Sequence, residues 1–410
     1  MKKLSFVRMA CMAVALSVAT ITSQAQTFNN ILSFDVSNGD NPWGALIQGT
    51  DGNFYGTTSS EYGSGYGSVF SLTSGGALTT VYSFCALPSC ADGSYPVAGV
   101  IQASDGNFYG TTNAGGAKND GTIFRLTPGG VLTTLYSFCA KTNCTDGIYP
   151  STGLVQASNG NFYGTTSYGG VMGFGTVYEI TPAGQLTTIY SFCSATNCVD
   201  GQIPFGQLIQ AKDGNLYGTT YSGGTSLNYG TIYSISLTGK LTTIYSFCSL
   251  PNCVDGDSPY AGVVQAGSGG FFGTASLGGA NGWGTVYKIT PAGRFTVLHA
   301  FCAKTNCPDG KLPTSRLVQG SSGDFYGTTA FGGSGCPGSN GYSGCGTVYK
   351  ITPAGRLTRL HAFDSADGAN PQSALLDVGG TFYGSTLEGG SSTACSSGCG
   401  TLFSLSGADK

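Results

Sequence analysis

The stretch Asp51-Gly-Asn-Phe-Tyr-Gly-Thr-Thr58 decides the fold, because versions of it occur seven times along the chain. It returns at 105–112, 159–166 and 213–220 and, more loosely, at 268–275, 322–329 and 379–386. The spacings between its aromatic residues are 54, 54, 54, 55, 54 and 57, measured over Tyr55, Tyr109, Tyr163, Tyr217, Phe272, Tyr326 and Tyr383. So strict a period indicates a repeat architecture, either a closed ring or a solenoid.

Each repeat is predicted to hold four short antiparallel strands. In the second repeat they are 98–104, 107–112, 121–127 and 131–138. Asp105-Gly106 is a two-residue hairpin turn, and Pro128 presets φ for the turn between the last two strands. Four such strands per unit are typical of a propeller blade.

The two ends of the repeat region distinguish a ring from a solenoid. Residues 30–34 match the end of a fourth strand, as in 134–138, whereas the last repeat stops after its third strand, 400–406. One end therefore carries the strand that the other lacks, which closes a ring, while a solenoid needs separate polar caps. The predicted fold is all-β: a seven-bladed β-propeller whose N-terminal strand completes the last blade.

The first 25 residues are predicted to be a signal peptide. Lys2, Lys3 and Arg8 precede a largely apolar stretch, and Ser23-Gln24-Ala25 supplies small residues for cleavage after Ala25. The apolar stretch is too short for a membrane anchor, and no other segment is long and apolar enough to span. We expect 26–410 to form a single propeller domain that is secreted or periplasmic.

Composition argues against nucleic acid as a partner. The chain has 17 basic and 20 acidic residues, and three of the basic ones lie in the leader. Nucleic-acid binding requires clustered Lys and Arg. Nothing in the sequence calls for a cofactor, and the partner is unknown.

The repeat resembles a known bacterial family. Its segments Asp-Gly-Asn-Phe-Tyr-Gly-Thr-Thr, Gly-Thr-Val-Tyr-Lys-Ile-Thr-Pro-Ala-Gly and Asp-Gly-x-x-Pro are similar to the GloVer tandem repeat of the choice-of-anchor proteins. The resemblance covers nearly the whole mature chain and transfers no catalytic residues. It implies a C-terminal surface-sorting segment in many members, which this sequence lacks, so we expect release or periplasmic retention.

The cysteines are predicted to form seven disulfides, each within one loop. Cys11 lies in the leader, and each of the other fourteen has a near neighbour, as expected for an exported protein. With only 2 histidines and no Cys-x2-Cys spacing, a zinc site is disfavoured. The predicted pairs are Cys85–Cys90, Cys139–Cys144, Cys193–Cys198, Cys248–Cys253, Cys302–Cys307, Cys336–Cys345 and Cys395–Cys399.

All length variation falls in the connections between the fourth and first strands (the D–A loops) and between the second and third (the B–C loops). These emerge on one face of the ring, the loop face, where binding sites usually lie.

Two sets of repeated polar residues could form sites, but a structural role is favoured for both. An Asx residue ending each D–A loop is interpreted as a turn cap: Asn38, Asp92, Asp146, Asp200, Asp255, Asp309 and Asp367. A glutamine in the first strand is interpreted as a cross-blade hydrogen-bond partner: Gln48, Gln102, Gln156, Gln210, Gln265 and Gln319, with Asp377 in the seventh place.

No catalytic or metal-binding set can be assembled from the repeat positions. His299 and His361 replace the tyrosine of an outer strand in two different blades, which makes them rim residues. The glutamates, Glu61, Glu179 and Glu388, occupy unrelated positions. We therefore assign no catalytic residue and no metal ligand.

Aromatic residues on the loop face are the best candidates for binding, since flat apolar rings with polar edges suit sugars and peptides. The alternative is that they pack against the disulfide loops. Arg316 stands where other repeats have Gly, Ala or Gln, and with Asp257 and Lys311 it could mark one wall of a pocket. The binding candidates are Trp43, Phe205, Tyr260, Trp283, Phe331, Tyr342 and Arg316.

Two functions stay open. The favoured one is a non-catalytic binding or scaffold propeller for a glycan or a cell-envelope protein. The alternative is a propeller enzyme acting on extracellular glycans as a lyase or hydrolase, which requires acid and base groups that converge at the axis.

Overall fold

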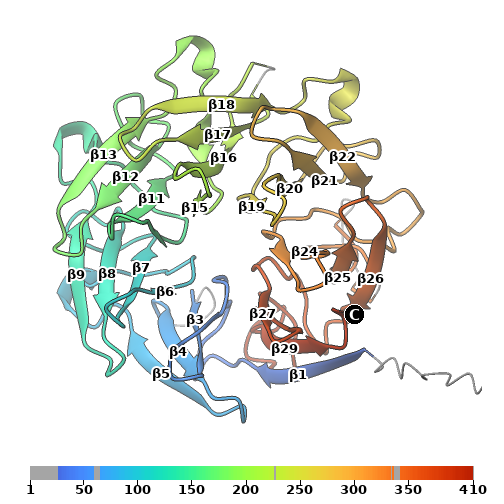
Figure 1. Cartoon of the computed structure of the whole chain (residues 1–410). Coiled ribbons are helices and arrows are strands. Elements are labelled where there is room, and N and C mark those ends of the chain that lie inside the picture. The colour runs from blue at the N-terminus through green and yellow to red at the C-terminus, as the bar shows by residue number, and fades with distance from the viewer. Residues whose placement is uncertain (1–25, 60–64, 226–227, 334, 337–341, 410) are drawn as a thin grey trace, which may run out of the picture.

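The computed structural model shows a closed ring of seven β-sheets (Figure 1). It describes residues 26–59, 65–225, 228–333, 335–336 and 342–409. The predicted signal peptide lies outside these residues. Within them, no helix is long and apolar enough to cross a membrane.

Each sheet is one blade, with strands A to D running from the axis to the rim. Blade 1 holds β2 (Ile47–Gln48), β3 (Phe54–Thr58), β4 (Ser68–Leu72) and β5 (Leu78–Ser83); blade 2 holds β6 (Ile101–Gln102), β7 (Phe108–Thr112), β8 (Thr122–Leu126) and β9 (Leu132–Ser137). Blade 3 holds β10 (Val155–Gln156), β11 (Phe162–Thr166), β12 (Thr176–Ile180) and β13 (Leu186–Ser191); blade 4 holds β15 (Ile209–Gln210), β16 (Leu216–Ser222), β17 (Thr231–Ile235) and β18 (Leu241–Ser246), with β14 (Gln202–Pro204) also on β16. Blade 5 holds β19 (Val264–Gln265), β20 (Phe271–Ala275), β21 (Thr285–Ile289) and β22 (Phe295–Ala300); blade 6 holds β23 (Val318–Gln319), β24 (Phe325–Thr329), β25 (Thr347–Ile351) and β26 (Leu357–Ala362). Blade 7 holds β27 (Leu376–Val378), β28 (Thr381–Thr386), β29 (Thr401–Ser406) and β1 (Thr27–Ser33).

The seventh blade is closed by the N-terminal strand, as the sequence predicts. Strand β1 pairs antiparallel with β29, from Thr27 opposite Ser406 to Ser33 opposite Thr401. The strand begins at Thr27 rather than at residue 30, because Phe28 stacks on His361 of blade 6 with ring centroids 3.7 Å apart. The N-terminal strand therefore joins blade 7 to its neighbour.

The innermost strands are shorter than predicted. The expected strand 98–104 is reduced to Ile101–Gln102. Towards the axis its main chain is instead held by side chains of the preceding blade, such as Thr57, whose Oγ1 donates a hydrogen bond to the carbonyl of Ala98 at 3.0 Å. Strands B, C and D agree with the prediction to within one or two residues.

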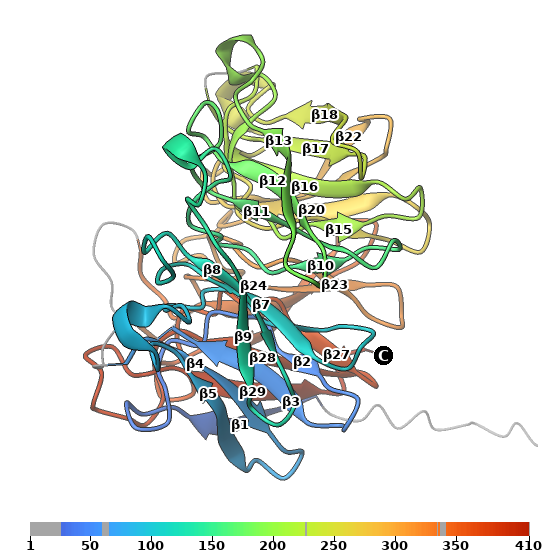
Figure 2. The same cartoon turned by 90° about the vertical axis from the view of Figure 1, so that its left-hand side faces the viewer.

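The D–A loops project from one side of the ring, where four of them carry a short helical turn (Figure 2). These turns are η1 (Pro88–Cys90), η2 (Thr142–Cys144), η3 (Thr196–Cys198) and η4 (Pro251–Cys253). All seven predicted disulfides are present, each within one loop.

Aromatic stacking joins neighbouring blades through the repeated motif. At six of the seven junctions the tyrosine or phenylalanine of one motif faces the phenylalanine of the next: Tyr55 lies 4.3 Å from Phe108, and Tyr109 lies 4.1 Å from Phe162. The same contact closes the ring between Tyr383 and Phe54, at 4.4 Å. Such pairs add about 0.5–1.5 kcal/mol beyond the area that they bury.

The Gly-Thr-Thr part of the motif has an equally specific role. A Cβ at Gly56 would lie 2.5 Å from Cζ of Phe70, so only glycine leaves room for that ring. The first threonine bonds to the next blade, as Thr57 does. The second bonds within its own blade, as in the 2.8 Å contact between the hydroxyls of Thr112 and Thr122.

In five blades the motif tyrosine is hydrogen-bonded to a carboxylate, which comes from different places in the sequence. In blade 1 it is the first turn residue, Asp51, which accepts from the Tyr55 hydroxyl at 2.9 Å. Blade 3 has Asn159 at that turn position, and Glu179 on strand C accepts from Tyr163 at 2.7 Å instead. Burial and this hydrogen bond to Glu179 raise the pKa of Tyr163 to about 12.

The C-terminal segment supplies the same group to blade 6. Asp409 accepts hydrogen bonds from the Tyr326 hydroxyl at 3.0 Å and from the amides and hydroxyls of Ser321 and Ser322. These bonds outweigh the effect of burial and lower the pKa of Asp409 to about 2. In blade 5, where the turn lacks a carboxylate, the tyrosine is replaced by Phe272.

Deleting residues 27–36 should destabilise the whole ring, because β29 becomes an open edge and the contact with blade 6 is lost. We expect a loss of more than about 4 kcal/mol in the free energy of unfolding, together with aggregation. Urea denaturation and light scattering measure both, with the exposed substitution Val36→Ser as the control. A deleted protein that stays monomeric and unfolds like the parent would contradict closure by β1.

Glu179→Ala should destabilise the protein by about 1–2 kcal/mol, because the Tyr163 hydroxyl loses its charged acceptor. Adding Asn159→Asp should restore most of this loss, since an aspartate there takes the place that Asp51 has in blade 1. Asn159→Asp alone should be neutral or destabilising, because it sets two carboxylates side by side. A double-mutant cycle of urea denaturation measures the coupling free energy between the two substitutions. If their effects on the free energy of unfolding simply add, an aspartate at position 159 does not replace Glu179.

Candidate functional site

The axis is lined by the segment that follows each D–A loop, in which alternate residues face inward. Three rows result, each with one residue per blade. The upper row, nearest the loop face, is Trp43, Val97, Ser151, Phe205, Tyr260, Thr314 and Gln372; the middle row is Ala45, Gly99, Gly153, Gln207, Gly262, Arg316 and Ala374. The lower row is Ile47, Ile101, Val155, Ile209, Val264, Val318 and Leu376.

A cavity of about 930 Å³ lies along this axis. Every upper-row and middle-row residue lines it, and four lower-row residues form its apolar end. Loop-face residues of blades 2 and 3, including Tyr149 and Tyr168, extend its wall. A volume of this size accommodates a small organic molecule or a short oligosaccharide.

Two aromatic walls face each other across the upper row. Phe205 and Tyr260 lie side by side, with ring centroids 4.4 Å apart. Blades 4 and 5, which carry them, stand opposite blade 1, which carries Trp43 (Figure 1). Burial raises the pKa of Tyr260 to about 12, so its hydroxyl stays protonated at physiological pH. The walls therefore combine flat apolar faces with polar edges.

Arg316 projects from the middle row with no neutralising partner among the described residues. Its Nε is buried without a hydrogen bond, and no ion pair to it is found within that part of the chain. Burial lowers the pKa of the guanidinium. Within the described part of the chain, one other charged side chain lines the cavity, Asp377, whose Oδ1 accepts a hydrogen bond from the Gly380 amide at 2.9 Å.

The structure divides the predicted binding residues into two groups. Trp43, Phe205, Tyr260 and Arg316 line the cavity. The other three form a separate cluster on the loop face, in which Tyr342 packs against Trp283 at 6.1 Å and against Phe331 at 5.4 Å.

Lys311 belongs to this second cluster, since its ammonium lies 4.8 Å from the centre of the Trp283 ring. Lys311 is only 3% exposed, and burial lowers its pKa. Neither Lys311 nor Asp257 lines the cavity, so the pocket wall predicted from these residues with Arg316 does not form.

Sequence reasoning missed Tyr149 and the backbone conformation that positions it. The residue before the proline of each Asp-Gly-x-x-Pro unit has positive φ, between 50° and 58°, even where it is a tyrosine or Ile203. Its amide donates to the preceding blade, as Tyr149 does to the Asp120 carbonyl at 2.9 Å. This residue and the one before it differ between repeats while the flanking glycine and proline stay constant, a signal that could have marked the position.

The repeated Asx residues cap their loops, as predicted. The Asp92 carboxylate accepts from the amides of Ala86 and Leu87, at 2.9 and 3.1 Å, and from the hydroxyl of Tyr82 at 2.8 Å. The glutamines link blades, also as predicted: the side-chain Oε1 of Gln102 accepts a hydrogen bond from the Thr50 amide of blade 1 at 2.8 Å.

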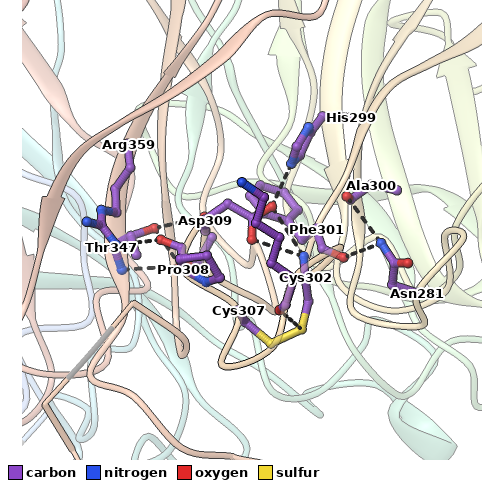
Figure 3. Close-up of polar contacts among 12 residues, drawn as sticks. Asn281, His299, Ala300, Phe301, Cys302, Cys307, Pro308, Asp309, Thr347 and Arg359 are labelled. Atoms are coloured by element: carbon purple, nitrogen blue, oxygen red, sulfur yellow. Dashed lines mark hydrogen bonds and ion pairs between the residues drawn. A yellow bond between two sulfur atoms is a disulfide. The ribbon is translucent and has the colours of Figure 1, made fainter.

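The histidines have a structural place in the same loops. Figure 3 shows His299 pointing at Asp309, with Nε2 2.9 Å from the carboxylate, beside the disulfide Cys302–Cys307. Arg359 of the next blade donates to the Pro308 carbonyl of this loop at 2.7 Å. His361 makes the equivalent contact with Asp367 at 2.8 Å. Both histidines thus replace the loop-binding tyrosine of other blades, at the rim.

One group of three potential metal ligands occurs among the described residues: Asp120, Cys139 and Cys144. Its two sulfur atoms are joined in a disulfide, and disulfide sulfurs are not thiolate ligands.

The ring and its axial cavity define a seven-bladed β-propeller with room for a ligand. The sequence matches the Gloeobacter/Verrucomicrobia repeat over residues 17–228 and 214–410, so the chain belongs to this repeat family. This confirms the resemblance drawn from the repeat. No curated protein matches the chain in sequence.

Several solved structures share the fold. Virginiamycin B lyase from Staphylococcus aureus superposes with a TM-score of 0.60 at 14% identity, over 93% of this chain and 99% of that one. PorZ of Porphyromonas gingivalis, a bacterial surface component of the type-IX secretion system, gives 0.53 at 14% identity, over 90% and 46%. A puromycin hydrolase gives 0.51 at 12%, over 85% and 50%. At these identities the likeness shows the fold alone.

Arg316→Gln should stabilise the protein by about 1–3 kcal/mol, because it removes a desolvated charge that has no partner. Glutamine is already tolerated at this level, where Gln207 donates to the Leu154 carbonyl at 3.2 Å. The midpoint of urea denaturation measures the gain, and Gln207→Ala, which removes a paired side chain, is the matched control. An Arg316→Gln protein no more stable than the parent would show that the guanidinium is already neutralised.

Proposed function

We propose that this protein is an exported binding propeller that takes a carbohydrate into its axial cavity from the loop face. The observation that carries the proposal is the pair of aromatic walls, Trp43 opposite Phe205 and Tyr260, above a cavity of about 930 Å³. A sugar ring has apolar faces and hydroxyl edges, so it can stack between such walls. Gln372 of the same row, whose side-chain nitrogen donates to Asn370 at 2.9 Å, can accept a hydrogen bond from a sugar hydroxyl through its side-chain oxygen.

The proposed location outside the cytoplasm rests on the disulfides and on the predicted signal peptide. Seven disulfides suit an oxidising compartment and would be reduced in most cytoplasms. The short loops stay closed by these bridges, so the loop face keeps its shape around the cavity mouth.

Binding is better supported than catalysis by the side chains at the axis. Acid–base catalysis uses groups that can exchange protons near the reacting atoms. The charged groups lining the cavity are Arg316 in blade 6 and Asp377 in blade 7, which stand at different depths, and both histidines are at the rim. Although a lyase and a hydrolase share the fold, fold likeness alone does not transfer an activity.

Trp43→Ala and Phe205→Ala should each weaken carbohydrate binding about tenfold or more, because each removes one stacking surface, a loss of about 1.4 kcal/mol. A glycan array of the mature protein identifies the ligand, and titration calorimetry measures the affinity of each variant. Tyr260→Phe keeps the ring and should bind nearly as well as the parent.

Trp283→Ala distinguishes ligand binding in the cavity from ligand binding at the second aromatic cluster. If the cavity is the site, this variant binds like the parent. A loss of affinity confined to Trp283→Ala would move the site to the cluster of Trp283, Phe331 and Tyr342. Urea denaturation of each variant shows whether the fold is intact.

A further inference from the structure

Arg316 is exceptional among the seven residues at its level. The middle row is otherwise made of Ala, Gly and one Gln, because the blades approach closely there: a Cβ at Gly99 would lie 2.4 Å from the Ala45 carbonyl oxygen. Gln207, the other long side chain of the row, is hydrogen-bonded across to blade 3. Arg316 alone in the row brings a charge to the axis.

This charge opposes folding, since an ion removed from water is costly unless it is paired. The neighbouring repeats show that alanine or glycine fits at this level, so the fold itself does not need an arginine. Arg316 keeps partial solvent exposure because it faces the cavity, while its Nε is buried and unbonded. An anion entering the cavity would satisfy both the charge and the free donors.

We propose that the cavity selects a carboxylated sugar, such as a uronic acid residue, and that Arg316 binds its carboxylate. This deepens the carbohydrate-binding function proposed above and rests on it. A planar guanidinium offers two parallel N–H donors that match the two oxygens of a carboxylate. Among the residues that the structure describes, the remaining lining is uncharged apart from Asp377.

Charge balance favours a carboxylate over a phosphate. A phosphate monoester carries between about −1.5 and −2 at neutral pH, which one arginine would leave partly uncompensated in a largely apolar cavity that also contains Asp377. A carboxylate carries a single negative charge and is matched by Arg316 alone.

The arrangement of the blades fits one sugar ring. Phe205 and Tyr260 belong to blades 4 and 5, and Arg316 belongs to blade 6, next to Tyr260 in the ring. Arg316 lies two residues beyond Thr314 of the upper row, in the segment that leads into β23, so it lies deeper in the cavity than the aromatic pair. A pyranose stacked on the aromatic pair can therefore direct its carboxylate towards the guanidinium.

The test compares acidic sugars with their neutral counterparts. Trisaccharides of glucuronate, galacturonate, mannuronate and guluronate are titrated into the mature protein, each beside its carboxyl-reduced form. We expect at least one acidic trisaccharide to bind ten times or more tightly than its reduced form. Arg316→Gln should bring that ratio close to one, because the acidic trisaccharide loses its charged partner. Arg294→Gln, the same change of charge at an exposed turn on the opposite face, should not alter the ratio.

The outcomes separate this inference from the function on which it rests. Equal binding of acidic and neutral sugars by the parent protein overturns the carboxylate but leaves a sugar site. Benzoate, a flat carboxylate that is not a sugar, is titrated while the Nε–H resonance of Arg316 is followed by NMR. A shift with benzoate when no trisaccharide binds supports the carboxylate and overturns the carbohydrate. If neither benzoate nor any trisaccharide binds, both the carboxylate selectivity and the carbohydrate-binding function are overturned.

Discussion

The stacking of one motif aromatic on the next holds the ring together. Each blade is a separate small sheet, and in the described part of the chain no β-ladder joins it to the blades on either side. The two faces of the sheet are therefore shielded from water only when the blade packs between two other blades. The contact from Tyr55 to Phe108 recurs at six of the seven junctions, up to the one where Tyr383 meets Phe54. Between blades 3 and 4 Leu216 takes the place of the phenylalanine beside Tyr163. Because every junction needs an apolar side chain against the motif aromatic of the preceding blade, the motif stays nearly constant while the loops vary. Adjacent threonines then fix the height of each blade against the next, as in the bond from Thr57 to the Ala98 carbonyl.

The tyrosine hydroxyl adds a second constraint, which the chain meets in several ways. A tyrosine that stacks between blades brings its hydroxyl to a partly buried place where a hydrogen-bond acceptor is needed. Asp51, Glu179 and Asp409 provide that acceptor from three different positions in the sequence. In blade 5 the need is removed by Phe272. The repeats thus preserve an interaction rather than a residue, and what looks like drift in single positions is compensated nearby.

Much of the architecture could be predicted because repetition makes local signals additive. The period, the hairpin turns and the complementary ends determined seven blades and closure by β1, and cysteine spacing determined the disulfides. Prediction from the sequence failed where the structure depends on contacts between residues of different blades. The inner strands were predicted too long, because side chains of the neighbouring blade replace their ladder. Trp283 was grouped with Trp43 since both are loop-face aromatics, yet only the ring geometry shows that one faces the axis and the other packs on Lys311.

The candidate site follows from what these constraints leave free. The residues of the motif, the turns and the loop caps make contacts that stabilise the fold. Residues can therefore vary without loss of stability mainly in the axial rows and at the loop tips. At the middle row the main chains of adjacent blades approach closely, which explains its Ala and Gly residues. An arginine in that row has little room except along the axis, and no described neighbour neutralises it there. Since stability does not account for Arg316, and the fold tolerates small residues in its place, its charge is best explained by what enters the cavity.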